Sequence, residues 1–232
     1  MAAGNFTTNG GPVEGTARLV QVDLRRSVPD FKYVAQLSDA GLINGVERWD
    51  DESVLLADST RGLILKVNVE NGHYYTAISD PTMAVPANAT INNIGINGIK
   101  RLDSFVYYTS SAQELFCRIP VDSSAAATGS VQVLASGFPQ DDFSLRPDGT
   151  AYIATNSLNT IVRVAGDGQV CTTAGSLDSI ALAADTSCQF GRTTRDSSIL
   201  YVSTAGGLTN PVNGTEVQPA TIMAVDMTEE RC

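Results

Sequence analysis

The sequence is poor in the residues that carry most hydrolytic and metal chemistry, with one histidine, one tryptophan and four cysteines among 232 residues. The histidine, His73, follows Asn71-Gly72, a dipeptide typical of hairpin turns, so we expect it on an exposed turn. A Ser-His-Asp hydrolase then has no base to use. No apolar run approaches the roughly 18–20 residues that cross a bilayer, and we therefore expect no membrane partner.

Positive charge is also scarce. Fifteen Lys and Arg residues stand against 25 Asp and Glu, which gives a formal charge of −10 and a pI near 4.4. A surface of this sign repels phosphate backbones, so we expect no nucleic-acid partner. Charged residues make up only 17% of the chain and hydrophobic residues 43%, with 20 Gly and 9 Pro, a profile typical of a turn-rich globular protein.

The cysteines are too few and too widely spaced for a zinc site or a dense disulfide framework. Cys171 and Cys188 are placed to pair across neighbouring strands, and Cys117 and Cys232 have no evident partner. The first six residues are too short and too polar for a secretory signal. Three Asn-x-Thr sequons leave secretion of a longer precursor open, so the compartment is undetermined; they begin at Asn5, Asn88 and Asn213.

An internal repeat is the main positive feature. Ile-Asn-Gly-Val-Glu-Arg-Trp-Asp at 43–50 returns as Ile-Asn-Gly-Ile-Lys-Arg-Leu-Asp at 96–103, and each copy precedes a strand-like segment. The offset of 53 residues, from Asn44 to Asn97, matches the scale on which a chain repeats one small sheet as a propeller blade.

Alternation and turn residues extend the repeat along the whole chain, and no segment shows a helical period. We predict an all-β protein of the six-bladed β-propeller type, with about four and a half blades in a single domain, 1–232. The chain would begin in the second blade of such a ring. Open blade edges would then allow self-association. The predicted blades are 15–42 (partial), 43–80, 96–137, 141–175 and 179–227 (partial), and the inner strand of the last is expected at 180–184.

Polar residues recur where the predicted inner strands begin, at Asn44, Asn97 and Asp141. Amide and carboxylate oxygens converging on one axis would suit a hard cation such as Ca²⁺. Asn-Gly is also an ordinary turn dipeptide, so a purely structural role stays open. Two long connections, 80–96 and 206–220, are expected to wall the same channel mouth, or to be plain surface loops.

Further candidates surround this polar set. Asp142, Asn156 and Met83 are candidate substrate-binding residues, together with Asn44. Arg192 lies in a loop of the last blade, where it could reach a substrate carbonyl or form a structural ion pair.

Several motifs together resemble the propeller family of gluconolactonases, senescence marker protein and luciferin-regenerating enzyme. The resemblance covers nearly the whole chain and is closest to the fungal branch, which includes hetero-Diels–Alderases of tropolonic sesquiterpenoid biosynthesis. The motifs are Ala3-Gly4-Asn5-Phe6-Thr7, Ile43-Asn44-Gly45, Asp80-Pro81-Thr82-Met83, Gly95-Ile96-Asn97-Gly98-Ile99, Leu115-Phe116-Cys117-Arg118-Ile119-Pro120-Val121 and Phe190-Gly191-Arg192-Thr193.

The resemblance implies two different chemistries. In the metal-dependent lactonases of the family, a Glu, an Asn and an Asp hold a divalent cation; Asn97 and Asp141 match the last two, and Asn44 matches a substrate-side Asn. The Glu has no counterpart here, and Glu14 is a poor substitute. In the hetero-Diels–Alderases, an apolar channel with a few amide donors holds a heterodiene and an alkene in a near-attack arrangement.

Three functions follow. The first is a hetero-Diels–Alderase-type cyclase on a terpenoid or tropolone substrate, with no cofactor and with Asn44, Asn97, Asp141 and Arg192 as catalytic residues. The second is a lactonase that uses Ca²⁺ or another divalent cation on Asn97 and Asp141. The third is a non-catalytic binder of a small organic molecule, or an inactive relative. Fold alone does not choose between them.

Overall fold

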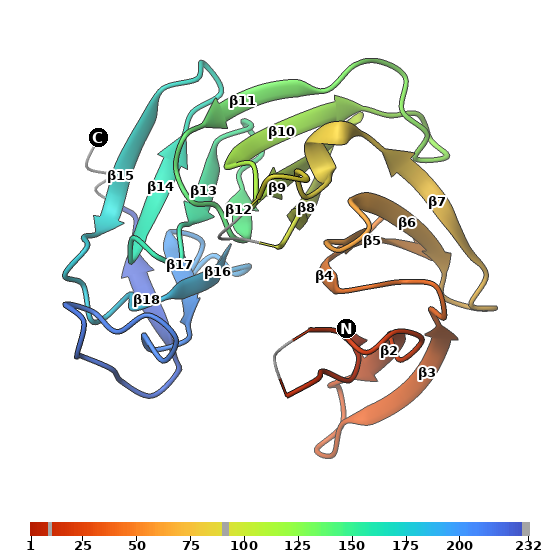
Figure 1. Ribbon diagram of the computed structural model, residues 1–232, viewed down its shortest axis with the longest axis horizontal. Coiled ribbons are helices and arrows are strands. Elements are labelled where there is room, and N and C mark those ends of the chain that lie inside the picture. The colour runs from red at the N-terminus through yellow and green to blue at the C-terminus, as the bar shows by residue number, and fades with distance from the viewer. Residues whose placement is uncertain (9–10, 90–92, 229–232) are drawn as a thin grey trace. The chain divides into compact units, whose positions relative to one another are not determined.

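The computed structural model describes residues 1–8, 11–89 and 93–228. The chain divides into two compact units, each described here by itself. Unit 1 comprises Met1–Gln113 and Arg118–Gln132, and unit 2 comprises Glu114–Cys117 and Val133–Cys232. Among the described residues, strands form five sheets, and in each sheet the neighbours are consecutive in sequence (Figure 1). Such meandering sheets are the blades of a β-propeller, so the predicted all-β propeller class is confirmed.

Unit 1 contains the first two sheets. The first sheet has the order β1-β2-β3 and the second has the order β4-β5-β6-β7. A short 3₁₀ helix, η1, follows the second sheet. The bounds are β1 Ala2–Ala3, β2 Arg18–Asp23, β3 Asp30–Gln36, β4 Ile43–Arg48, β5 Ser53–Asp58, β6 Leu63–Asn68, β7 Tyr74–Ser79 and η1 Pro81–Met83.

The third sheet has the order β8-β9-β10-β11, and the division between the units runs through β10 and β11. Unit 2 contains the fourth sheet, β12-β13-β14-β15, and the three-stranded fifth sheet, β16-β17-β18. The bounds are β8 Ile96–Leu102, β9 Phe105–Ser110, β10 Leu115–Pro120, β11 Gln132–Ser136, β12 Phe143–Leu145, β13 Ala151–Ala154, β14 Thr160–Val164, β15 Val170–Gly175, β16 Asp185–Phe190, β17 Ile199–Thr204 and β18 Thr221–Asp226.

One predicted strand is wrong. Residues 180–184 were expected to form the inner strand of the last sheet, but they form turns, and the strand there is β16, which starts at Asp185. The apolar run at 180–184 is buried for another reason: Leu182 packs into the core of unit 2. A short apolar run does not distinguish a strand from a buried turn.

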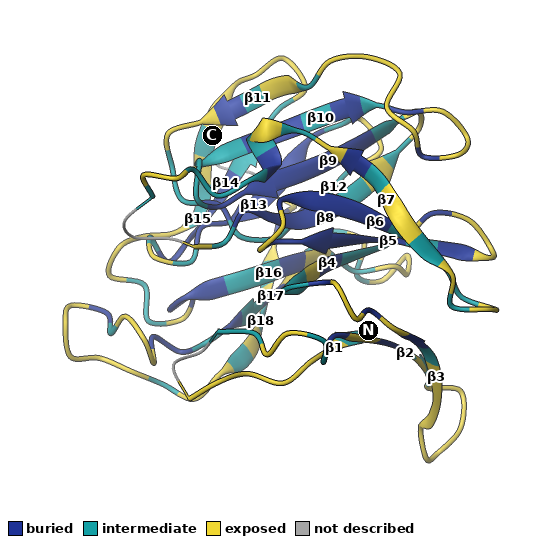
Figure 2. Cartoon of the chain, turned by 45° about the vertical axis from the view of Figure 1, so that its right-hand side comes forward, coloured by how far each residue is buried: buried dark blue, intermediate teal, exposed yellow. Residues whose placement is uncertain are grey.

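Each unit has its own core. In unit 1, Leu19 of the first sheet and Leu37, the residue after β3, pack with Leu56 and Leu65 of the second sheet. In unit 2, Tyr152 and Ile161 of the fourth sheet pack with Leu200 and other residues of the fifth. Figure 2 shows the consequence for the strands: β5 and β6 are largely buried, whereas β3 and β18 carry exposed residues.

Trp49, the single tryptophan of the chain, is held on three sides in unit 1. Its side chain is 4% exposed, and its indole Nε1–H donates to the carbonyl oxygen of Ser123 at 3.0 Å. The guanidinium of Arg101 lies 4.1 Å from the ring centroid, and Lys66 Nζ lies 5.4 Å from it. Cation–π contacts of this kind fix the indole between β4, β6 and β8.

The expected Cys171–Cys188 pair is not formed. Cys188 is a free buried thiol that donates to the carbonyl oxygen of Tyr152 at 3.1 Å, whereas Cys171 is disulfide-bonded. Cys188 lies on β16, whereas the strand expected at 180–184 did not include it. Cys117 is also a free buried thiol, and Cys232 lies outside the described residues, as does Thr90 of the second sequon.

In the part of the chain that the structure describes, no helix is long and apolar enough to cross a membrane.

Candidate functional site

The Asn-Gly dipeptides of the repeat form irregularities at the starts of two inner strands of unit 1. The register of β4 with β5 shifts across Asn44-Gly45, and that of β8 with β9 shifts across Asn97-Gly98. A bulge bends a strand and re-aims its side chains. Gly45 is required because a Cβ there would stand 2.5 Å from the backbone oxygen of Asn97. Asn44-Gly45 therefore serves close packing of neighbouring inner strands, and neither dipeptide is a hairpin turn.

The two asparagines of unit 1 have different environments. Asn97 is 2% exposed, and its Nδ2–H donates to Ser111 Oγ at 2.9 Å. The Gly98 N–H beside it donates to Thr109 Oγ1 at 2.9 Å. Asn44 is exposed. The bulges thus present Asn44 to solvent and keep Asn97 in a buried hydrogen-bond network.

In unit 2, Asp141 and Asn156 meet at the start of β12. The backbone N–H of Asp141 donates to the carbonyl oxygen of Ala154, and Asn156 Nδ2–H donates to Asp141 Oδ2 at 3.0 Å. Both side chains are half-buried. Asn156 has a φ of 57°, a left-handed conformation that asparagine tolerates. Since a primary amide has two N–H donors, Asn156 can be held by Asp141 and still offer a hydrogen bond to a ligand.

Asp185 is the first residue of β16 and neighbours this pair through Asn156. Its side chain is 0% exposed, it forms a β-bridge with Asn156, and its Oδ2 accepts the Thr155 N–H at 2.8 Å. Its Oδ1 has no hydrogen-bond partner among the described residues. Burial raises the pKa of Asp185 to about 8; backbone hydrogen bonds, first that of Thr155, lower it, and the charge of Asp141 raises it. The carboxyl therefore keeps its proton at neutral pH.

Asp142 links β12 to β16 by hydrogen bonds. Its Oδ1 accepts the N–H of Phe143 at 2.8 Å, and its Oδ2 accepts the hydroxyl of Ser187 at 2.8 Å. Both carboxylate oxygens therefore have protein donors, which is the pattern of a carboxylate that positions strands.

Arg192 and Met83 lie elsewhere. Arg192 is exposed beyond the last residue of β16, whereas Asp185 is the first residue of that strand. The strand rise puts at least about 17 Å between the two ends, so Arg192 and the Asp141–Asn156 pair lie at opposite ends of their sheets. Met83 is fully buried in η1 of unit 1. His73 is exposed between β6 and β7, as predicted.

The two long connections belong to different units. In unit 1, Asp80 caps η1, and Thr82 Oγ1 lies 2.6 Å from the hydroxyl of Tyr108 on β9. Gln113 Nε2 donates to the carbonyl oxygens of Pro81 and Ala84, at 2.8 Å each. In unit 2, Val212 is buried within the connection 206–220. The connection in unit 1 is therefore attached to β9, and the connection in unit 2 is buried at Val212.

Asp185 is the residue that the sequence reasoning missed. The misplaced strand at 180–184 left it outside the predicted inner strand, although the spacing contained the signal. The step from Asn97 to Asp141 is 44 residues, and a second step of 44 residues leads to Asp185.

The structure does not test the predicted cation site on Asn97 and Asp141, and that site stays a prediction. Asn97 is buried and its Nδ2–H donates a hydrogen bond to Ser111 Oγ, and Asp141 Oδ2 accepts a hydrogen bond from Asn156. Asn97 belongs to unit 1 and Asp141 to unit 2. Among the described residues, no group of three His, Cys, Asp or Glu side chains is arranged to hold a metal. We derive no step through a cation.

No family model matches the chain. Two curated proteins are similar in sequence. "Putative hetero-Diels-Alderase" from Phoma sp is 27% identical over 196 residues, covering 75% of this chain and 56% of that protein. "Putative hetero-Diels-Alderase asR5" from Sarocladium schorii is 26% identical over 225 residues, covering 82% and 55%. The chain thus spans about half the length of these relatives.

Solved structures share the fold. A Bacteroides thetaiotaomicron protein of unknown function has a TM-score of 0.63 at 14% identity, covering 94% of this chain and 58% of its own. A luciferin-regenerating enzyme has a TM-score of 0.51 at 12% identity, covering 86% and 82%. A protein described as a "putative gluconolactonase" has a TM-score of 0.51 at 16% identity, covering 77% and 63%.

At these identities the solved structures show the fold alone, whereas the curated relatives carry the sequence resemblance. The chain resembles hetero-Diels–Alderases in sequence and gluconolactonase-like propellers in fold, which confirms the family resemblance that its motifs predicted.

Proposed function

We propose that the chain acts as a hetero-Diels–Alderase-type cyclase on a terpenoid or tropolone substrate. The similarity to two curated proteins of that name supports the reaction class. The substrate class rests on the family resemblance of the motifs. A six-bladed ring, of which this chain supplies five sheets among its described residues, is part of the same proposal.

The proposed reaction needs no acid–base catalysis. In a hetero-Diels–Alder addition, one C–C and one C–O bond form as the π bonds of heterodiene and alkene rearrange. No proton or leaving group is released. Catalysis then consists of holding the partners in a near-attack arrangement and donating hydrogen bonds to the carbonyl oxygen of the heterodiene. An exposed His73 is no obstacle to such a mechanism.

The Asp141–Asn156 pair is the observation that carries the proposal in unit 2. Asp141 accepts one N–H of the Asn156 amide and so fixes the direction of the other. Protonated Asp185, which bridges to Asn156, adds no second negative charge, so a carbonyl oxygen that gains electron density is less strongly repelled. Asn156 would be the donor to that oxygen, and Asp141 and Asp185 would position it.

The test is turnover of a tropolone-type heterodiene with a terpenoid alkene, followed by chiral chromatography. Protein should give one enantiomer, whereas the uncatalysed reaction gives a racemate. Asn156→Gly should lower turnover by about tenfold or more, the loss of roughly one hydrogen bond to the developing charge. Glycine accepts a positive φ, so the backbone is not strained.

Asn213→Gly is the matched control, because Asn213 is an exposed asparagine with a φ of 51° on the connection 206–220. It should turn over substrate as the wild type does. A racemic product with wild-type protein would contradict the proposal. Saturable lactone hydrolysis that needs added Ca²⁺, Mn²⁺ or Zn²⁺ and stops with a chelator would favour the lactonase instead.

A further inference from the structure

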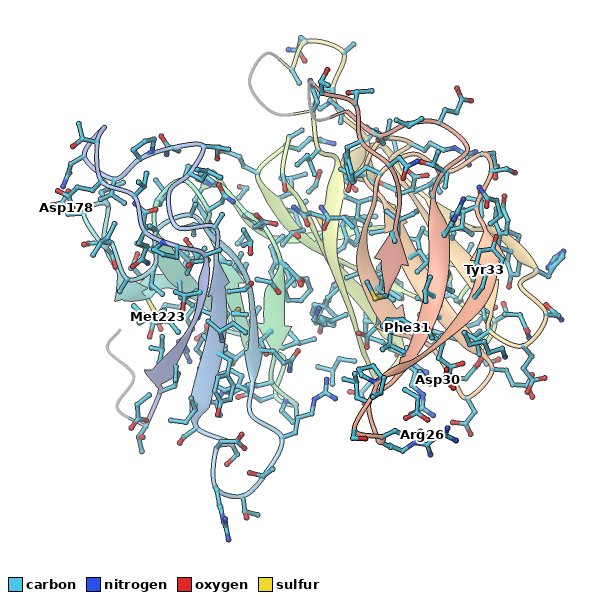
Figure 3. All side chains as sticks on the ribbon, turned by 90° about the horizontal axis from the view of Figure 1, so that it is seen from below. Arg26, Asp30, Phe31, Tyr33, Asp178 and Met223 are labelled. Atoms are coloured by element: carbon cyan, nitrogen blue, oxygen red, sulfur yellow. The ribbon has the colours of Figure 1, made fainter. Side chains whose placement is uncertain are left out.

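The connection 206–220 of unit 2 carries one of the three sequons, Asn213-Gly214-Thr215. The connection joins β17 to β18, and Met223 of β18 is labelled in Figure 3. In secreted proteins, an Asn followed by any residue except Pro and then by Ser or Thr is an acceptor of an N-linked glycan. A triplet also arises by chance, so the local structure has to show whether the fold alone accounts for it.

The turn accounts for the first two residues of the triplet. The backbone N–H of Thr215 donates to the carbonyl oxygen of Val212 at 3.1 Å, and the two residues between them, Asn213 and Gly214, have φ of 51° and 77°. A two-residue hairpin turn with both φ values positive favours Asn-Gly. It places no such demand on Thr215, whose hydroxyl makes no hydrogen bond among the described residues.

The base of this turn is fixed within unit 2, whereas its tip has room around it. Val212 is 2% exposed and forms a β-bridge with Glu216. Asn213, Gly214 and Thr215 are exposed, and a Cβ placed on Gly214 would have no atom within 4 Å. The amide of Asn213 makes no hydrogen bond within the described part of the chain. A substituent on this amide therefore breaks no contact of unit 2.

The sequon at Asn5 has a different environment. The hydroxyl of Thr7, its third residue, donates to the carbonyl oxygen of Gly11 at 3.2 Å and accepts the N–H of Gly11 at 3.1 Å. That threonine therefore has a structural role of its own. The sequon at Asn88 includes Thr90, which lies outside the described residues.

The cysteines give an independent indication of the compartment. Cys171 on β15 is disulfide-bonded, and disulfides persist in the secretory pathway and outside the cell, where N-linked glycans are also found. Cys117 and Cys188 keep their thiols and are both buried, so oxidants have little access to them.

We propose that the chain passes through the secretory pathway and carries an N-linked glycan on Asn213. The donor is an oligosaccharide on a lipid diphosphate. The bond from the first sugar carbon to the diphosphate oxygen breaks, a bond from that carbon to Asn213 Nδ2 forms, the amide gives up one proton, and the lipid diphosphate leaves. Transfer takes place as the chain enters the pathway, before it folds, so unit 2 need only leave room for the sugar at this turn. The inference does not depend on the proposed reaction.

The experiment maps glycans on the full-length protein isolated from the cells that naturally make it. Peptide N-glycosidase in ¹⁸O-water converts a glycosylated Asn into a mass-labelled Asp, which mass spectrometry detects after trypsin digestion. Residues 196–230 contain no Lys or Arg, so Asn213 is released on one long peptide that holds no other sequon. Thr215→Ala destroys the sequon and leaves Asn213 in place, and Thr215→Ser, which keeps the sequon, is the matched control.

Wild type and Thr215→Ser should carry the label at Asn213, and Thr215→Ala should lose it. Both substitutions alter an exposed side chain, so all three proteins should fold, which circular dichroism checks. An unlabelled Asn213 in the wild type would overturn the proposal, even if Asn5 or Asn88 were labelled. A label that persists in Thr215→Ala would do so too, because it would come from spontaneous deamidation and not from a glycan.

Discussion

Strands β5 and β17 are both the second strand of their sheets and both are apolar, yet within their own units only β5 has neighbouring sheets on both faces. Five of the six residues of β5 are buried, whereas β17 alternates between buried and less buried positions. Leu56 of β5 lies in the core of unit 1, and β5 also contacts β8 of the next sheet. Burial here is set by how many sheets flank a strand, since apolar composition is similar in the two.

The buried aspartates at the ends of the two strands also differ, in the number of hydrogen bonds that their carboxyl groups accept. Asp58, the last residue of β5, is fully buried and accepts backbone N–H groups of Gly41, Thr60 and Arg61 at 2.9–3.2 Å. Asp185 pairs with Thr204 at the end of β17 and is equally buried, but its Oδ1 lacks a partner within the described residues. The two carboxyl groups are equally buried, but the free-energy cost of desolvation is offset better for Asp58, because more backbone N–H groups donate to it.

Leu56→Ala should have the largest effect on stability. The side chain is 0% exposed, and its loss leaves a cavity between two sheets, which lowers the free energy of unfolding by about 2–5 kcal/mol. Leu200→Ala, on the covered face of β17, is the matched variant with 0% exposure and should cost a similar amount. Urea denaturation measures both. A cost for Leu200→Ala as small as that of a surface substitution would mean that β17 is poorly covered on both faces.

Asp185→Asn should change how stability depends on pH. The pKa of this carboxyl is 3.8 in its ordinary state and about 8 in the folded chain, so between these values the unfolded chain releases the proton and the folded chain keeps it. The free energy of unfolding therefore falls as pH rises from about 4 to about 8, by an amount on the order of 5–6 kcal/mol in total, and the fall ends above that window. The substitution should remove this slope in denaturation curves measured across the window, because an amide does not titrate there.

Asp148→Asn is the contrasting variant, because the pKa of Asp148 is lowered in the folded chain, whereas that of Asp185 is raised. A backbone hydrogen bond from Thr150 lowers the pKa of Asp148, so its contribution to stability is present at neutral pH and is lost as pH falls through the lowered value. Removing Asp148 should leave the slope between pH 4 and 8 in place. If both variants flattened that slope, its assignment to Asp185 would be wrong.

Tyr201→Ala should have the smallest effect. Its side chain, on β17, is 39% exposed, so truncation removes little buried surface. We expect a change in the free energy of unfolding of about 0.5 kcal/mol or less. A loss comparable to that of Leu56→Ala would show that another part of the protein covers the Tyr201 ring.

Most of the fold could be predicted from the sequence, because the 53-residue repeat and period-two alternation both follow from the geometry of a blade. Each of the three complete ranges expected, 43–80, 96–137 and 141–175, contains the four strands of one sheet. The failure at 180–184 has a physical reason: Leu182 is buried by packing of a turn, and apolar character alone does not report backbone conformation.

The candidate site was predictable only in part. Asn97 and Asp141 were recognisable from their place in the repeat, and spacing could also have given Asp185. The hydrogen bond from Asn156 to Asp141 depends on the left-handed conformation of Asn156, which asparagine favours but which the sequence does not determine. The disulfide of Cys171 was assigned to the wrong partner, because cysteine spacing does not determine connectivity.

The setting of Trp49 gives the chain an internal optical reporter. Since no other residue is a tryptophan, emission excited at the red edge of the absorption band comes from one indole, which is dry, hydrogen-bonded to Ser123 and stacked under Arg101. That indole belongs to unit 1. Its fluorescence therefore records the melting of unit 1 alone, and comparison with a whole-chain signal reveals whether the two units melt as one or in succession.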